Sequence, residues 1–152
     1  MNKKVILALD NLDLGTALSI SNQVKDKLLT VKVGLELFNL VSKTGIKRFN
    51  DIGVNNLLLD LKLNDIPATV YRSILALKGI KFGFLTVMAL GGNEMIKQAK
   101  KAASELDPNI KILAVTILTS LSKQELSKMG FSSSVEDTVI QLAQNSNEAH
   151  GF

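Results

Sequence analysis

The chain has 152 residues, of which 46% are hydrophobic and 21% are charged, and it contains no cysteine and a single histidine, His150. This length and balance are typical of one globular domain and exclude a disordered or fibrous protein. Without cysteine there can be no disulfides and no thiolate metal site. No apolar run is long enough to predict a membrane span or a secretory leader, so we expect a cytoplasmic protein with no membrane partner.

The net charge of +4 comes from 18 basic and 14 acidic residues. The basic residues are scattered instead of forming one tract, and the chain has one tyrosine and no tryptophan with which to stack bases. This pattern suits an anionic small molecule and predicts no nucleic-acid partner.

Five short apolar runs read as strands that are covered on both faces, because they lack polar alternation. They comprise residues 5–9, 31–34, 56–61, 82–89 and 110–116. A stretch with helical spacing follows each run. The first of these stretches places Leu14, Ala17, Leu18 and Val24 at helical spacing, and the second places Leu37, Leu40 and Val41 on one face. The other three stretches cover residues 66–78, 93–106 and 135–147. Strand followed by helix, five times over, predicts a parallel α/β architecture with right-handed crossovers.

Two architectures accommodate five such units. A doubly wound open sheet would be complete at this length. An eight-fold barrel would need about 240 residues at the observed spacing of about 30 per unit, so the chain would hold only part of it. The positions of the charged residues distinguish the two.

Charged residues stand at the ends of three successive predicted strands. Asp10 closes the first, Lys32 lies within the second, and the third ends with Asp60 and Lys62, followed by Asp65. Residues two apart on a strand point to the same side, and buried charges are costly unless they are paired. We therefore expect these side chains to converge on one site, as they would at the mouth of a barrel.

The segment from Asp60 to Thr69 has the pattern Asp-x-Lys-x-x-Asp-Ile-Pro-x-Thr, which resembles the signature of the orotidine 5′-phosphate decarboxylase family. Four further family landmarks occur in order. They are Ala8-Leu9-Asp10, Lys32-Val33-Gly34, Gly91-Gly92 and the run from Ala114 to Ser120. The resemblance covers essentially the whole chain.

The resemblance implies the fold. Family members are (β/α)8 TIM barrels, and residues 149–152 are similar to the approach to a sixth strand. We therefore expect one partial TIM-barrel domain over residues 1–152, made of about the first five βα units. It would lack the late-strand arginine with which this family holds phosphate, and a glutamine that helps to hold the base and phosphate.

The resemblance also implies decarboxylation of orotidine 5′-phosphate to UMP, with no metal and no organic cofactor. The catalytic residues would be Lys32, Asp60, Lys62 and Asp65. Lys62 would protonate the C6 carbanion, and Asp65 would come from the partner subunit of a homodimer. The substrate-binding residues would be Asp10, Lys32, Asp60, Leu61, Lys62, Leu63, Asn64, Asp65, Ile66, Pro67, Ala68, Thr69 and Thr119.

Three residues depart from the family pattern. Asn64 and Met88 stand where histidine is usual, and Ala68 stands where asparagine is common. Two other interpretations stay open. One is a sugar-phosphate decarboxylase or aldolase of the same suprafamily, such as hexulose-phosphate synthase, which uses a carboxylate-bound Mg²⁺. The other is a truncated product without activity of its own.

Overall fold

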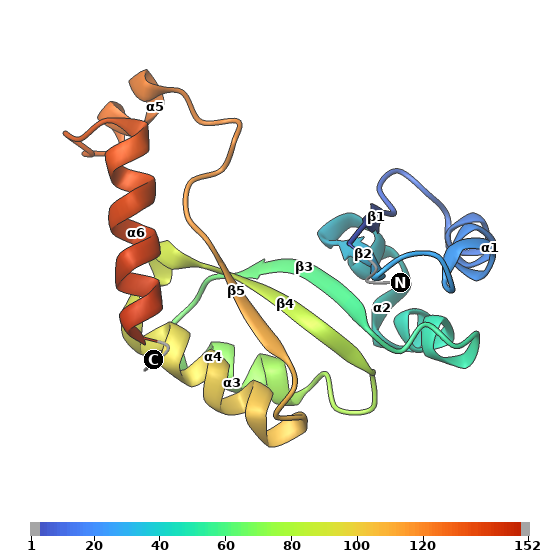
Figure 1. Ribbon diagram of the computed structural model, residues 1–152. Coiled ribbons are helices and arrows are strands. Elements are labelled where there is room, and N and C mark those ends of the chain that lie inside the picture. The colour runs from blue at the N-terminus through green and yellow to red at the C-terminus, as the bar shows by residue number, and fades with distance from the viewer. Residues whose placement is uncertain (1–3, 150–152) are drawn as a thin grey trace.

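The computed structural model describes residues 4–149, so His150 and the rest of the expected approach to a sixth strand, residues 151–152, lie outside the described residues. Its elements alternate strand and helix along the chain (Figure 1). The strands are β1 (Ile6–Ala8), β2 (Thr30–Gly34), β3 (Leu57–Leu63), β4 (Phe82–Met88) and β5 (Lys111–Val115). The helices are α1 (Leu14–Val24), α2 (Leu35–Asp51), α3 (Pro67–Leu75), the short 3-10 helix η1 (Ala89–Gly91), α4 (Gly92–Leu106), α5 (Lys123–Lys128) and α6 (Val135–Ala149).

All five strands pair in parallel, in the order β1-β2-β3-β4-β5. A sheet whose strands are adjacent in chain order is typical of a barrel wall, whereas a doubly wound sheet reverses its strand order at a switch point. Helices α3 and α4 lie together on one face of β3, β4 and β5 (Figure 1). In the described part of the chain β1 pairs only with β2, and β5 only with β4, so the sheet is open at both edges. The predicted α/β class is confirmed, and the sheet is part of a barrel wall.

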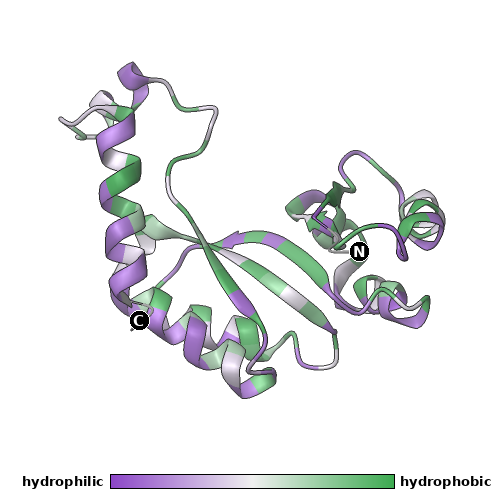
Figure 2. Cartoon of the chain, viewed as in Figure 1, coloured by the Kyte–Doolittle hydropathy of each residue, from purple (hydrophilic) through white to green (hydrophobic). Residues whose placement is uncertain are grey.

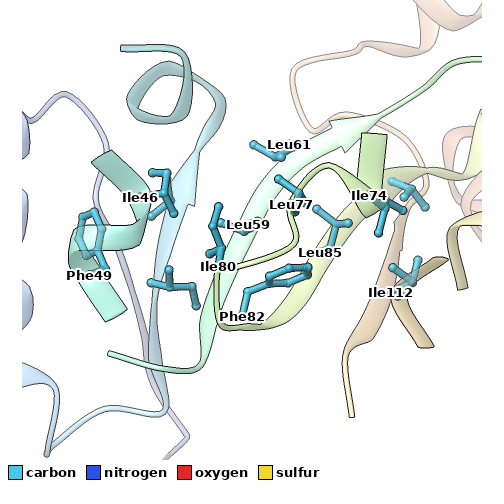
Figure 3. Packing of buried hydrophobic residues seen from close by; sticks show 14 of the residues in the cluster. Ile46, Phe49, Leu59, Leu61, Ile74, Leu77, Ile80, Phe82, Leu85 and Ile112 are labelled. Atoms are coloured by element: carbon cyan, nitrogen blue, oxygen red, sulfur yellow. The ribbon is translucent and has the colours of Figure 1, made fainter. Parts of the chain in front are cut away.

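The hydrophobic core lies between the strands and the helices that cover them. Figure 3 shows Leu59 of β3, Leu85 of β4 and Ile112 of β5 gathered with Ile74 of α3. Strands β3 and β4 are mostly hydrophobic in colour, whereas α4 and α6 mix hydrophobic and hydrophilic segments (Figure 2). Burial of this apolar surface is the main force that holds the helices on the sheet.

None of the helices in residues 4–149 is long and apolar enough to cross a membrane.

One expectation about the helices was wrong, and one helix was missed. Leu40 was placed on the buried face of its helix, but it is 67% exposed, while Leu37 on the same helix is buried. At 3.6 residues per turn, Leu40 lies on one side of Leu37 and Val41 on the other, so Leu40 is at the edge of the predicted face. The helix also breaks after these residues, at Ser42, whose φ of 56° interrupts the helical backbone. Helix α5 was not predicted, although Ser122 and Glu125 form a capping box that opens it.

Candidate active site

The C-terminal ends of the first three strands bring four charged side chains into one network. The Lys32 ammonium lies 2.9 Å from Asp10 Oδ1 and 3.4 Å from Asp60 Oδ2. The Lys62 ammonium lies 2.8 Å from Asp60 Oδ1. The charges therefore alternate in the order Asp10, Lys32, Asp60, Lys62, and each amine faces at least one carboxylate. We call these four residues the charge network.

Asp60 is the centre of the charge network. Its side chain is only 15% exposed, against 39% for Lys62 and 53% for Asp10. Burial alone would raise the pKa of Asp60, but hydrogen bonds from Lys62 and Thr86 and the charges of Lys62 and Lys32 outweigh it, so the pKa lies below its usual value. Asp60 is thus a carboxylate at neutral pH, held between two ammonium groups.

Lys32 is the interior cation of the charge network. Burial works against its charged form, but its hydrogen bond to Asp10 and the charges of Asp10 and Asp60 outweigh burial and keep the pKa of Lys32 above its usual value. Gly34 leaves room for this pair, since a Cβ there would lie 3.0 Å from Asp10 Oδ1 and 3.5 Å from Lys32 Nζ. This close approach explains on steric grounds why glycine, with no Cβ, stands at the end of the Lys32-Val33-Gly34 landmark.

An irregularity in β3 sets the position of Lys62. Leu59 pairs with Leu85 and Leu63 pairs with Val87, so three residues of β3 lie opposite the single residue Thr86 of β4. Lys62 adopts a φ of 48°, in the left-handed region that lysine rarely occupies. Such strain is found where the surrounding structure imposes it, often at functional sites.

Thr86 was not anticipated from the sequence. Its side chain is buried and its hydroxyl lies 3.0 Å from Asp60 Oδ1 and 2.9 Å from the backbone nitrogen of Lys62. The available signal was a polar residue in the middle of the apolar run 82–89. The bulge that brings it opposite Asp60 and Lys62 has no such signal.

The remaining expected site residues lie outside the charge network. The Leu61 side chain belongs to the hydrophobic core, which leaves only its backbone for contact with a substrate. Asp65 is exposed, and its carboxylate accepts a hydrogen bond from the backbone N–H of Ile66 at 2.7 Å. Leu63 ends β3, and Asn64 follows it in the turn. Pro67, Ala68 and Thr69 form the start of α3, and Thr119 is exposed in the segment between β5 and α5.

The charge network can bind an anion and donate a proton to it. Its two ammonium groups can hold an anionic ligand, and Lys62, the more exposed of them, can deliver a proton to it. Among residues 4–149, no group of three or more His, Cys, Asp or Glu side chains is arranged to hold a metal ion.

Comparison with known proteins gives consistent matches in sequence and in structure. The chain is 39% identical over 150 residues to the orotidine 5′-phosphate decarboxylase of Fusobacterium nucleatum subsp. nucleatum, with 98% of this chain covered. It is 36% identical over 140 residues to the enzyme of that name from Wolbachia sp. subsp. Brugia malayi, with 92% covered. The match spans 63% of the length of the first relative and 61% of the second.

A crystal structure of orotidine 5′-phosphate decarboxylase from Lactobacillus acidophilus superposes with a TM-score of 0.83 at 37% identity, covering 97% of this chain and 68% of that one. An uncharacterized conserved protein from Geobacillus kaustophilus superposes with a TM-score of 0.84 at 28% identity, covering 95% and 69%. The model of the orotidine 5′-phosphate decarboxylase / HUMPS family matches residues 3–152. The chain therefore belongs to the orotidine 5′-phosphate decarboxylase / HUMPS family.

Proposed function

We propose that this protein forms the catalytic part of an orotidine 5′-phosphate decarboxylase, which converts orotidine 5′-phosphate to UMP and carbon dioxide. The observation that carries the proposal is the charge network, in which Lys62 and Lys32 both face the Asp60 carboxylate. Loss of carbon dioxide leaves an electron pair on C6 of the pyrimidine, and no ring position delocalises it well. The reaction therefore needs a fixed cation and a proton at that carbon.

Lys62 is suited to supply both. Its ammonium donates a hydrogen bond to the Asp60 carboxylate at 2.8 Å, which fixes the position of the positive charge and of its protons. The C6–carboxylate bond breaks, carbon dioxide leaves, and the electron pair on C6 takes the proton from Lys62 Nζ. Asp60 would lie beside the departing carboxylate, with Lys32 holding it from the other side, and Asp10 would hold the ribose hydroxyls.

A homodimer is part of the proposal. The second carboxylate of the family motif, Asp65, bonds to its neighbouring backbone and lies outside the charge network of its own chain. Asp65 of a partner subunit would complete the array beside Lys62. The exposed apolar side chains of Ile66 and Leu35, near the same strand ends, are suited to such an interface. Thr69 and Thr119 would contact the phosphoribosyl group and the base. We place the reaction in the cytoplasm.

The chain spans less than two thirds of the curated relatives named above, so the whole enzyme would need further βα units to close its barrel. Phosphate binding remote from the reacting carbon lowers the barrier in such enzymes, and barrels commonly bind phosphate at their late strands. We therefore expect residues 1–152 alone to consume orotidine 5′-phosphate at a negligible rate.

The proposal is tested with a chimera that joins this chain to the part of the Fusobacterium nucleatum relative left uncovered by the match. The chimera is expected to consume orotidine 5′-phosphate, followed by its absorbance. Lys62→Ala should reduce turnover by at least about a hundredfold, the scale of a lost general acid. The matched control is Lys25→Ala, because the Lys25 ammonium bonds to the Ile52 carbonyl, away from the charge network. A folded chimera without turnover, or with equal turnover in both variants, would contradict the proposal.

A further inference from the structure

Thr86 uses its single hydroxyl twice. Its Oγ1 accepts a hydrogen bond from the backbone N–H of Lys62 at 2.9 Å and donates one to Asp60 Oδ1 at 3.0 Å. The residue is 6% exposed, on a strand whose other side chains are apolar or absent. A buried hydroxyl with both its proton and a lone pair engaged has one preferred orientation. It therefore ties the backbone of one network residue to the carboxylate of another.

The backbone of β3 needs this partner. Between the pairs Leu59–Leu85 and Leu63–Val87, the bulge takes Lys62 out of the regular ladder of the sheet. The Lys62 N–H, in a residue of left-handed φ, donates instead to the hydroxyl of the Thr86 side chain. A buried N–H without any acceptor would destabilise this conformation.

The same hydroxyl completes the setting of Asp60. Oδ1 of Asp60 receives hydrogen bonds from Lys62 Nζ and from Thr86, while Oδ2 faces Lys32 at 3.4 Å. Both carboxylate oxygens are thus assigned to partners, and Thr86 is the only uncharged side chain among these partners. Without it, the carboxylate could rotate between the two ammonium groups.

We propose that Thr86 is a positioning residue, whose hydroxyl fixes the Asp60 carboxylate and the Lys62 backbone relative to each other. It acts on the reaction through these two residues and does not itself touch the substrate. Its kinetic consequence rests on the proposed function, whereas its structural consequence can be measured without turnover.

The structural test uses the 152-residue protein and NMR. Thr86→Val removes the hydroxyl and keeps the shape of the side chain, and Thr86→Ser keeps the hydroxyl. The matched control is Thr138→Val, because Thr138 of α6 is also buried and its hydroxyl donates to the carbonyl of Ser134, just before that helix, away from the charge network. The readouts are hydrogen exchange of the Lys62 amide and the titration of the Asp60 carboxyl carbon.

In Thr86→Val we expect the Lys62 amide to exchange at least about tenfold faster and the pKa of Asp60 to rise, because each group is deprived of a hydrogen bond. Thr86→Ser and Thr138→Val should leave both readouts near those of the unchanged protein. Unchanged readouts in Thr86→Val would overturn the proposal, as would equal changes in Thr138→Val. If Thr86→Val does not fold, Thr86→Ser decides, since a loosened Lys62 amide despite the retained hydroxyl would refute the role.

The kinetic test uses the chimera with the Fusobacterium nucleatum relative. Thr86→Val should lower kcat about tenfold or more with a smaller change in KM, because the substitution removes a hydrogen bond to a charged group. Thr86→Ser should restore most of kcat. An equal loss in Thr86→Ser and Thr86→Val would contradict the hydroxyl's role. A chimera without any turnover would refute the proposed function, and the NMR result would still decide the role of Thr86.

Discussion

The left-handed backbone of Lys62 predicts that glycine at this position gives a more stable protein than alanine, the reverse of the usual order. At φ 48° the side chain crowds the backbone, which costs about 1–2 kcal/mol for any residue with a Cβ. Glycine escapes this cost but loses more backbone entropy on folding, by about 0.5–1 kcal/mol. In Lys62→Gly the first effect outweighs the second. We therefore expect Lys62→Gly to be more stable than Lys62→Ala by about 1 kcal/mol.

Lys32 provides the matched control. It belongs to the same charge network but lies in the regular strand β2, outside the residues of positive φ. At Lys32 glycine relieves no strain and only loses more backbone entropy on folding than alanine does. Lys32→Ala should therefore be more stable than Lys32→Gly by about 0.5–1 kcal/mol. The four variants are compared by urea unfolding. The same preference for alanine at both positions would refute the strain that we ascribe to Lys62.

Three further predictions concern the surroundings of the charge network and the first helix. Gly34→Ala should change the unfolding free energy by less than about 1 kcal/mol, because its Cβ meets the end of the exposed Asp10 side chain, yet it should weaken UMP binding by the chimera, measured by calorimetry. Folding lowers the pKa of Asp60, so the stabilisation by its carboxylate is complete above about pH 5 and is lost as the pH falls through the folded pKa. The difference in unfolding free energy between the protein and Asp60→Asn should therefore shrink as the pH is lowered from about 5, and a constant difference would contradict this. Asp13→Ala should lower the midpoint of urea unfolding, because the Asp13 carboxylate caps α1 through the N–H of Thr16 at 3.0 Å, and an unchanged midpoint would refute the cap.

The sequence was sufficient to predict the strands and the convergence of the charges. Strands buried by helices leave continuous apolar runs, and the charged residues at the ends of those runs must meet where parallel strands end together. Asp10, Lys32, Asp60 and Lys62 were expected in one site, and the structure brings them together. The observed ends of the strands differ from the predicted ones by one or two residues, as with β3, which extends to Leu63.

The details of the charge network could not be predicted, because they depend on tertiary contacts. Regular alternation was expected to bring Asp60 and Lys62 to one side, but the structure does this through a bulge opposite Thr86 and a left-handed Lys62. Neither leaves a local pattern in the sequence. The break in α2 at Ser42 is similar, since no proline or glycine occupies the position.

The central claim is that the amines of Lys32 and Lys62 form the site that holds the nucleotide. The most direct measurement is an NMR titration with UMP of the chimera with the Fusobacterium nucleatum relative, in which the side-chain amines of the lysines are observed individually. The signals of Lys32 and Lys62 should shift together and saturate with a single affinity, while the signal of Lys25, bonded to the Ile52 carbonyl, should stay in place. Saturating shifts confined to lysines outside the charge network, or no shift of Lys32 and Lys62 at any UMP concentration, would contradict the claim.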